Sequence, residues 1–212
     1  TKGAKDASPG GHSLDAREAA VLKQLAEVQD PYIGMLLNDR YKIIKKLGAG
    51  GTGAVYLAEH VMIERRVAIK ILRSEYARDA DITKRFFNEA LAVNRIDHPS
   101  LVQIHEHGQL PDGTAYLVME LLKGETLAQR MRQLGGRLPT QQASQIMWQV
   151  AAALQAAHDK AIVHRDLKPA NLMLVPDPLV PSGERVKVLD FGIAKLAADA
   201  CHGTAATLVM GT

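Results

Sequence analysis

The sequence predicts an α+β protein in which an antiparallel sheet comes first and a mainly helical region follows. Residues 38–72 contain alternating and β-branched stretches around a cluster of glycines, which is typical of antiparallel strands. Residues 81–96 and 140–158 carry apolar side chains at helical spacing. We therefore expect a small sheet-based unit with one main helix, followed by a second, helical unit.

The composition is that of an ordinary globular chain and excludes several classes of function. The 212 residues are 47% hydrophobic and 23% charged, enough for one or two compact domains. A net charge of +3 is too small to indicate nucleic-acid binding. The single cysteine, Cys201, fits a reducing compartment, and no apolar run approaches the roughly eighteen residues that span a bilayer. We expect a cytoplasmic location, with neither nucleic acid nor membrane contacting the visible chain.

The first 37 residues divide into two parts. Residues 1–12 are rich in Gly, Pro, Ser and Lys, so we expect a disordered tail. Residues 13–37 are expected to be a helical extension, because Ser13 can cap a helix and apolar residues follow at helical spacing. This helix either packs on its own domain or binds a partner or a second copy of the chain.

Four glycines mark the first turn of the sheet region: Gly48, Gly50, Gly51 and Gly53. Glycines allow a backbone to approach a phosphate closely and to direct its N–H groups toward it. A dinucleotide-binding site would need a helix directly after them. Here the apolar residues Val55, Tyr56 and Leu57 continue a strand, which favours a hairpin that covers phosphates.

Two charges lie where apolar residues are expected. Lys70 stands between Ile69 and Ile71 in a strand, and Glu89 falls on the apolar stripe of the helix predicted over 81–96. Because leaving a buried charge unpaired typically costs about 3–5 kcal/mol, we predict that Lys70 and Glu89 form an ion pair.

The helical region begins after the strand and turn of residues 113–127. Residues 140–158 predict a long core helix with Ile146, Val150, Leu154 and Ala157 on its buried face. Trp148 lies off that face and is assigned to packing elsewhere. The histidines show no metal-ligand spacing.

Two further stretches carry motifs that are characteristic of one family. They are AIVHRDLKPANLMLV, residues 161–175, and VKVLDFGIAK, residues 186–195. Together with the glycine turn and the strand that holds Lys70, they resemble the ordered motifs of the eukaryotic-type protein kinases, and they are most similar to the bacterial serine/threonine kinases. The resemblance covers residues 41–212. It implies a two-lobe fold, with a small lobe over 38–122 and part of a large lobe over 123–212.

The resemblance also implies a role for each motif residue. Lys70 would hold the α- and β-phosphates of ATP, and Glu89 would orient Lys70. Asp166 would accept the proton of the substrate hydroxyl, and Lys168 would lie by the γ-phosphate. The metal ligands for Mg²⁺, or for Mn²⁺ in its place, would be Asn171 and Asp190.

A nucleotide pocket is implied in the same way, with aliphatic side chains around the adenine, the backbone of the connecting segment bonding the base, and glycines over the phosphates. The residues are Leu47, Gly48, Gly50, Gly53, Val55, Ala68, Lys70, Met119, Glu120, Leu122 and Met173. Glu125 is placed near the ribose.

Lys168 is typical of the Ser/Thr-specific form of the catalytic loop, so protein Ser/Thr hydroxyls are the expected acceptors. Arg165 resembles the subset of kinases controlled by phosphorylation of the activation segment, where Thr204 and Thr207 are the candidate phosphosites. Residues 175–185 hold three prolines and a glycine, and we expect an exposed hairpin tip there.

The resemblance is expected to stop within the large lobe, because the segment and helices that usually follow Thr212 are absent from the sequence. We expect residues 1–212 alone to be marginally stable and inactive. The alternatives are a non-catalytic nucleotide-binding or interaction module and a small-molecule kinase. The first usually lacks a lysine or aspartate motif, and the second is disfavoured by LDFGIAK, residues 189–195.

Overall fold

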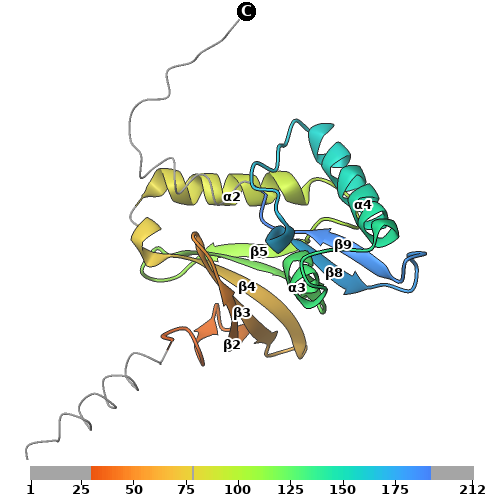
Figure 1. Cartoon of the computed structure of the whole chain (residues 1–212). Coiled ribbons are helices and arrows are strands. Elements are labelled where there is room, and N and C mark those ends of the chain that lie inside the picture. Colours follow the sequence, from red (N-terminus) through yellow and green to blue (C-terminus); the bar gives the residue numbers. More distant parts are fainter. Residues whose placement is uncertain (1–29, 78, 192–212) are drawn as a thin grey trace, which may run out of the picture.

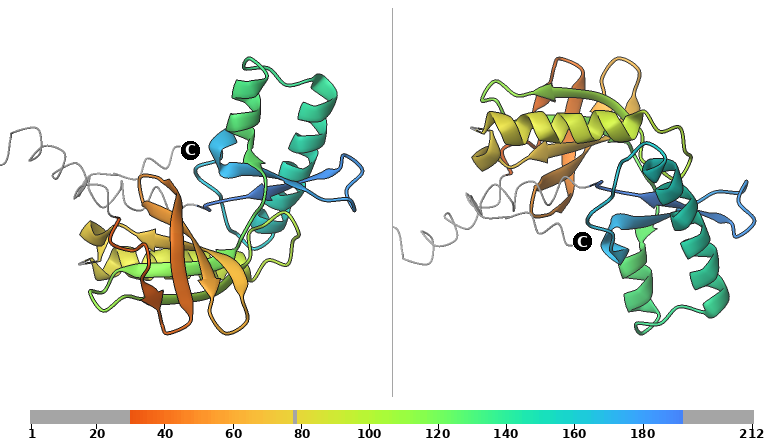
Figure 2. Two further views of the ribbon diagram at one scale, coloured as in Figure 1. Left: turned by 90° about the horizontal axis from the view of Figure 1, so that it is seen from below. Right: turned by 90° about the horizontal axis from the view of Figure 1, so that it is seen from above.

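The computed structural model describes residues 30–77 and 79–191, which form two antiparallel sheets with helices packed against them (Figure 1). The larger sheet has the strand order β1-β2-β3-β4-β6-β5, and the smaller has the order β7-β8-β9. Figure 2 shows the two sheets as separate layers of the molecule, joined through the segment after β6. The predicted α+β class and the antiparallel strands are confirmed.

The larger sheet is built from strands that follow one another closely in the sequence. Its members are β1 (Leu36–Leu37), β2 (Tyr41–Ala49), β3 (Gly53–His60), β4 (Arg65–Leu72), β5 (Ile104–Gln109) and β6 (Ala115–Glu120). Within β4, every residue from Val67 to Leu72 is buried, because one face of the sheet meets its own core cluster and the other meets helix α2 (Ala80–Asn94).

Helix α2 packs against both sheets. Asp79 caps its first turn by accepting hydrogen bonds from the backbone N–H groups of Asp81 and Ile82. Ile82 and Phe86 pack on the larger sheet, whereas Val93 belongs to the core of the second sheet. The helix predicted from the apolar stripe is confirmed, and it joins the two cores along its length.

The second sheet consists of short strands beside two helices. Its strands are β7 (Glu125–Thr126), β8 (Leu172–Pro176) and β9 (Glu184–Val188), and the helices are α3 (Leu127–Gln133) and α4 (Thr140–His158). Two 3-10 turns complete the described elements, η1 (Ser74–Tyr76) and η2 (Pro169–Asn171). Ile146, Val150 and Ala157 of α4 are buried, as predicted.

Three features near helices α3 and α4 and the β8–β9 hairpin bear on the predictions from the sequence. Trp148 is 79% exposed on the outer side of α4, so its assignment to packing is wrong. Helix α3 was missed, although Thr126 and Gln129 form a capping box at its start. The expected exposed hairpin tip is confirmed between β8 and β9, where Leu179 is 87% exposed.

The predicted helical extension over 13–37 differs from the structure in its last part. Residues 13–29 lie outside the described residues, as does the predicted tail over 1–12. Asp30 begins a turn that leads into strand β1, and Gly34, Asn38 and Asp39 adopt positive φ angles that end any helix. None of the described helices is long and apolar enough to cross a membrane.

Gly53 lies against the backbone of the neighbouring strand, so its substitution should affect stability. A Cβ atom at this position would overlap the carbonyl oxygen of Ile71. We expect Gly53→Ala to lower the free energy of unfolding by about 1–3 kcal/mol, since the clash involves backbone and cannot be relieved by a rotamer change. Urea denaturation measures this change.

Gly51 provides the matched control within the same turn. A Cβ atom there has no neighbour within 4 Å. The free energy of unfolding of Gly51→Ala should therefore stay within about 0.5 kcal/mol of the wild-type value. An equal loss of stability in the two variants would contradict the close-approach explanation.

Candidate active site

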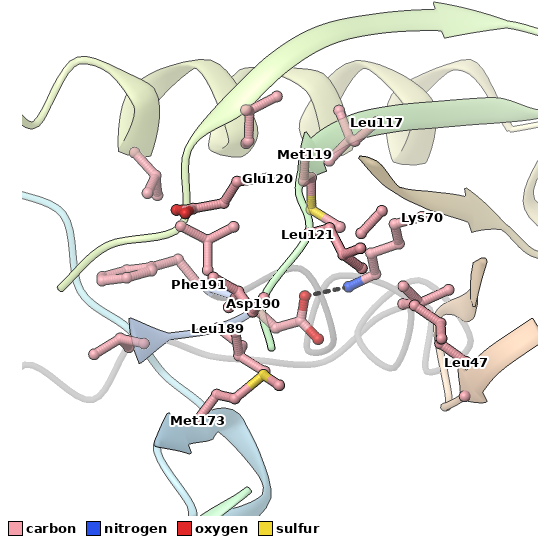
Figure 3. A pocket seen from close by; sticks show the side chains of 18 of the residues that line it. Leu47, Lys70, Leu117, Met119, Glu120, Leu121, Met173, Leu189, Asp190 and Phe191 are labelled. Atoms are coloured by element: carbon pink, nitrogen blue, oxygen red, sulfur yellow. Dashed lines mark hydrogen bonds and ion pairs between the residues drawn. The ribbon is translucent and has the colours of Figure 1, made fainter. Parts of the chain in front are cut away.

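A cavity of about 480 Å³ lies between the two sheets and is lined mainly by aliphatic side chains (Figure 3). This volume is within the range of about 300–1,000 Å³ that small-molecule sites occupy. Strands β2, β3, β4 and β6 contribute one wall, and β8 with the segment after β9 contributes the other. From the predicted nucleotide pocket, the lining includes Leu47, Gly48, Val55, Ala68, Lys70, Met119, Glu120, Leu122 and Met173.

Three residues of the predicted pocket do not line the cavity. Gly50 and Gly53 form the tip of the turn between β2 and β3, where the N–H of Gly50 donates to the carbonyl of Gly53 at 2.8 Å. Glu125, expected near the ribose, instead accepts a hydrogen bond from Arg130 at 2.7 Å. Thr126 and Gln129, which the sequence reasoning missed, line the cavity next to it.

Lys70 is the cation of the cavity. Only 3% of this residue is exposed, and its Nζ lies 2.5 Å from Oδ1 of Asp190 (Figure 3). Asp190 follows β9 and adopts a φ of 50°. The ion pair therefore connects the central strand of the larger sheet to the segment that leaves the smaller one.

Glu89 does not form the predicted ion pair with Lys70. Its side chain lines the same cavity from α2, but its Oε2 atom is buried and has no hydrogen-bond partner among the described residues. Burial raises the pKa of this carboxyl from 4.5 to about 7, and Arg165 and Arg85 oppose that shift. The difference from the prediction has a physical cause: Lys70 pairs with Asp190, so Lys70 does not offset the burial of Glu89, and a larger share of this carboxyl is protonated near neutral pH.

A second charged group lies on the segment between α4 and β8. Asp166 accepts from Nζ of Lys168 at 2.8 Å and from Nδ2 of Asn171 at 3.0 Å. The hydrogen bond from Lys168 lowers the pKa of Asp166, and that from Asn171 lowers it further. The structure thus brings three predicted site residues together and keeps Asp166 ionised at neutral pH.

His164 joins this group to Asp190, and the sequence reasoning did not identify it. It is 3% exposed, and its Nε2 lies 2.8 Å from the carbonyl oxygen of Leu189. Its Nδ1 lies 3.3 Å from the backbone nitrogen of Asp166, so Nε2 donates and Nδ1 accepts. Burial lowers the pKa of His164, which keeps the ring neutral. One signal for a buried residue was present in the sequence: the apolar residues 161–163 directly precede this histidine.

The segment that connects the two sheets makes a contact that the sequence reasoning missed, between Glu120 and Lys187. Oε1 of Glu120 accepts from Nζ of Lys187 at 2.6 Å and from the backbone N–H of Gln103 at 2.9 Å. Lys187 lies in β9, three residues before Asp190. The side chain of Glu120 and its backbone N–H, which donates to the carbonyl of Gln103 at 3.0 Å, are therefore both engaged within the protein.

The donor set fits a hard divalent cation. Both side-chain N–H bonds of Asn171 reach Asp166, so its amide oxygen is the remaining ligand group, and Asp190 supplies a carboxylate. No cluster of three or more His, Cys, Asp or Glu side chains suited to a metal occurs in residues 30–77 and 79–191. Mg²⁺ is usually held by one or two carboxylates together with substrate phosphates and water, and these oxygens match that pattern.

Comparison with known proteins shows which family and which relatives this chain resembles. The family model described as "Protein kinase domain" matches residues 41–212. Serine/threonine-protein kinase PknA of Mycobacterium tuberculosis (strain H37Ra) is 40% identical over 186 residues, which cover 86% of this chain and 41% of PknA. Serine/threonine-protein kinase Pkn1 of Myxococcus xanthus is 42% identical over 188 residues, 89% of this chain and 26% of Pkn1.

Solved structures agree with these sequence comparisons. The kinase domain of Mycobacterium tuberculosis PknI, in a double-mutant crystal structure, has a TM-score of 0.66 and 30% sequence identity. That match covers 76% of this chain and 61% of the PknI chain. The chain thus spans less than half the length of PknA and Pkn1 and about three fifths of this solved domain.

The raised pKa of Glu89 predicts how stability changes with pH. A group whose pKa is raised in the folded state stabilises the protein fully below its unfolded pKa, and this contribution is lost as the pH rises through the folded pKa. Relative to Glu89→Gln, the wild type should lose stability between pH 4.5 and about pH 7 and then level off. We expect a change on the order of 2 kcal/mol after allowance for partial exposure.

Denaturant unfolding of both proteins across pH 4–9 measures this difference. Glu75, an exposed glutamate in η1, is the matched control, because Glu75→Gln removes a carboxylate far from the cavity and should leave the slope in place. A wild-type stability that rises over the same interval, relative to Glu89→Gln, would show that Glu89 is paired and ionised in the folded protein.

Proposed function

Since the chain belongs to the protein kinase family, we propose that it carries the nucleotide-binding and catalytic residues of an ATP- and Mg²⁺-dependent serine/threonine protein kinase. The proposed reaction transfers the γ-phosphoryl group of ATP to Ser or Thr hydroxyls of protein substrates. One observation supports this proposal above the others. The buried cation of the cavity, Lys70, is paired with Asp190, and His164 links the Asp190 segment to the Asp166 group.

The cavity accounts for binding of the nucleoside. Ala68 and Val55 on one wall and Met173 on the other provide aliphatic surfaces for the two faces of a planar base. Residues 120–122 line the same cavity, so backbone groups of the connecting segment are available to hydrogen-bond the base edge. Gly48 also lines this cavity and can approach the phosphates closely because it has no side chain.

The charged groups account for binding of the phosphates. Lys70 would contact the α- and β-phosphates, and Lys168 would neutralise charge near the γ-phosphate. When bound, Mg²⁺ would neutralise further negative charge on the phosphate oxygens, held by Asn171 and Asp190. Asp190 contacts Lys70 through one oxygen in this structure, and the ammonium group has three N–H donors, so Lys70 can contact a phosphate as well. Glu89 lines the same cavity and is the carboxyl group proposed to orient Lys70.

Asp166 is the residue proposed to accept the proton of the acceptor hydroxyl. Its carboxylate stays ionised at neutral pH, so it can accept the hydroxyl proton as the oxygen attacks the γ-phosphorus. The new bond joins that oxygen to phosphorus, the bond between the β,γ-bridging oxygen and phosphorus breaks, and ADP leaves. Lys168 and Asn171 fix the carboxylate for this role at 2.8 and 3.0 Å.

Acceptor class and regulation rest on the sequence and on the relatives. Lys168 and the similarity to PknA and Pkn1 support Ser/Thr acceptors. Regulation by phosphorylation of Thr204 and Thr207 remains a proposal, since both residues lie outside the described part of the chain. The helix proposed to bind a partner or second copy lies outside it as well, and Mn²⁺ in place of Mg²⁺ and a cytoplasmic location remain predictions.

A non-catalytic nucleotide-binding module is the alternative function. Such a module would be favoured by loss of a lysine or aspartate of the site. Lys70, Asp166 and Asp190 are all present, and two of them form the ion pair across the cavity. These residues support catalysis over the alternative.

The third prediction concerns the proposed base. Asp166→Asn keeps the size of the side chain but removes the carboxylate that accepts the proton, so we expect phosphoryl transfer from ATP to fall at least 100-fold. Lys70→Met should cause a comparable loss because it removes the cation for the phosphates. Transfer of radiolabelled γ-phosphate to a Ser/Thr protein acceptor measures both effects. The wild type and the variants are assayed in a chain that extends beyond Thr212, because residues 1–212 alone are expected to be inactive.

Asp177→Asn is the control for this experiment. Asp177 also forms an ion pair, with Arg185 at 2.5 Å, but it lies at the β8–β9 hairpin tip away from the cavity. Its activity should match that of the wild type. Full activity of a pure Asp166→Asn preparation would refute the assignment of Asp166, and binding of ATP without any transfer by the wild type would favour the non-catalytic module.

A further inference from the structure

The segment Asp30–Leu37 lies beside β2 and is attached to it by backbone hydrogen bonds (Figure 1). The N–H of Gly34 donates to the carbonyl of Ile43, and the N–H of Ile43 donates to the carbonyl of Met35, each at 2.9 Å. Leu36 and Leu37 then pair with β2 as strand β1. We call residues 30–37 the leading segment. Its backbone forms the edge of the larger sheet, next to the strand that enters the glycine turn.

Asp30 attaches the leading segment to the sheet through its side chain. Oδ1 accepts from the backbone N–H of Tyr32 at 3.2 Å and from the hydroxyl of Tyr56, and Oδ2 accepts from Nζ of Lys46 at 3.0 Å. The Tyr56 hydroxyl lies 3.0 and 2.9 Å from the two oxygens. Tyr56 is 1% exposed, so its hydroxyl has no access to bulk water as an alternative partner.

The same three side chains also pack on one another. The ring of Tyr32 meets that of Tyr56 edge to face, with centroids 5.6 Å apart, and Nζ of Lys46 lies 5.8 Å from the Tyr56 centroid. Charge-assisted hydrogen bonds combined with aromatic contacts restrict all of these side chains to one arrangement. We call Asp30, Tyr32, Lys46 and Tyr56 the Asp30 cluster.

The position of the Asp30 cluster in the sheet connects it to the cavity. Lys46 and Tyr56 are direct cross-strand partners, and the next pair toward the turn is Gly48 with Val55. The register shifts between these two pairs, so Leu47 is an extra residue on β2, as in a β-bulge. Leu47, Gly48 and Val55 all line the cavity. Asp30 therefore holds the last regular pair before the part of the hairpin that faces the nucleotide.

We propose that Asp30 is a positioning residue for the nucleotide, because it fixes the Lys46–Tyr56 pair and thereby the bulge at Leu47 and the glycine turn. This inference deepens the proposed function and rests on it for the identity of the ligand, ATP. Asp30 acts from outside the predicted small lobe and has no contact with the cavity. The leading segment thus provides a physical connection between residues that precede the small lobe and nucleotide affinity.

A purely structural role of the Asp30 cluster would give a different experimental result. If the Asp30 cluster only stabilised the sheet, its loss would lower the melting temperature and leave the folded hairpin and its ligand affinity unchanged. If it positions the turn, its loss changes nucleotide affinity in protein that is still folded. Affinity and local opening of the turn therefore separate the two roles.

The test compares the wild type with Asp30→Ala, Asp30→Asn and Tyr56→Phe. Binding of Mg·ATP is measured by calorimetry at a temperature where every variant is folded, and amide hydrogen exchange is followed over residues 48–53. Removing a charge-assisted hydrogen bond should raise the Kd for ATP roughly three- to tenfold in Asp30→Ala. Asp30→Asn keeps an acceptor for Tyr56 and should have a smaller effect, and all three variants should exchange faster over 48–53.

Glu59→Gln is the matched control. Glu59 lies on β3 three residues beyond Tyr56 and pairs at 3.7 Å with Arg66 on β4. The substitution therefore removes a carboxylate from an ion pair on the same strand without touching the β2–β3 pairing. Its Kd and exchange should equal those of the wild type. Lower melting temperatures with unchanged Kd and unchanged exchange over 48–53 would overturn the positioning role. A wild type that does not bind ATP would instead refute the proposed function, and the exchange over 48–53 would still decide whether Asp30 positions the turn.

Discussion

The ion pair between Lys70 and Asp190 is the interaction on which the rest of the structure depends. An ammonium group in the fully buried part of β4 would cost several kcal/mol if it had no partner. Its partner comes from the other sheet, so the requirement to neutralise Lys70 joins the two layers at the cavity. The same pair provides the proposed phosphate-binding cation and one proposed metal ligand.

Two other features keep these groups in register. Helix α2 contributes Phe86 to the core of one sheet and Val93 to the core of the other, so Glu89 between them is carried to the cavity by packing at both ends. On the opposite side, neutral His164 bonds the carbonyl of Leu189 and the N–H of Asp166. The proposed base and the proposed metal ligand are thus connected through backbone groups, which change little when side chains move.

Much of this arrangement could be predicted from the sequence, because residue spacing reports burial well. Periodicity located the strands, α2 and α4, and the inward charges Lys70 and Glu89 were identified because they interrupt apolar patterns. The ion-pair partner was predicted incorrectly, since burial shows that a charge needs a partner but not which of two carboxylates supplies it. The Asp30 cluster depends on contacts between segments that lie apart in the sequence, which no local pattern reports. Glu125 was placed incorrectly for another reason, because the side chain of Arg130, five residues further on, binds it.

Calorimetric titration of the wild type and Lys70→Met with ATP and with adenosine tests whether Lys70 binds the phosphates while the aliphatic walls bind the base. We expect the wild type to bind ATP more tightly than adenosine, and Lys70→Met to lose most of this preference while it still binds adenosine. Equal affinity of the wild type for the two ligands, or an unchanged preference in Lys70→Met, would show that Lys70 does not bind the phosphates.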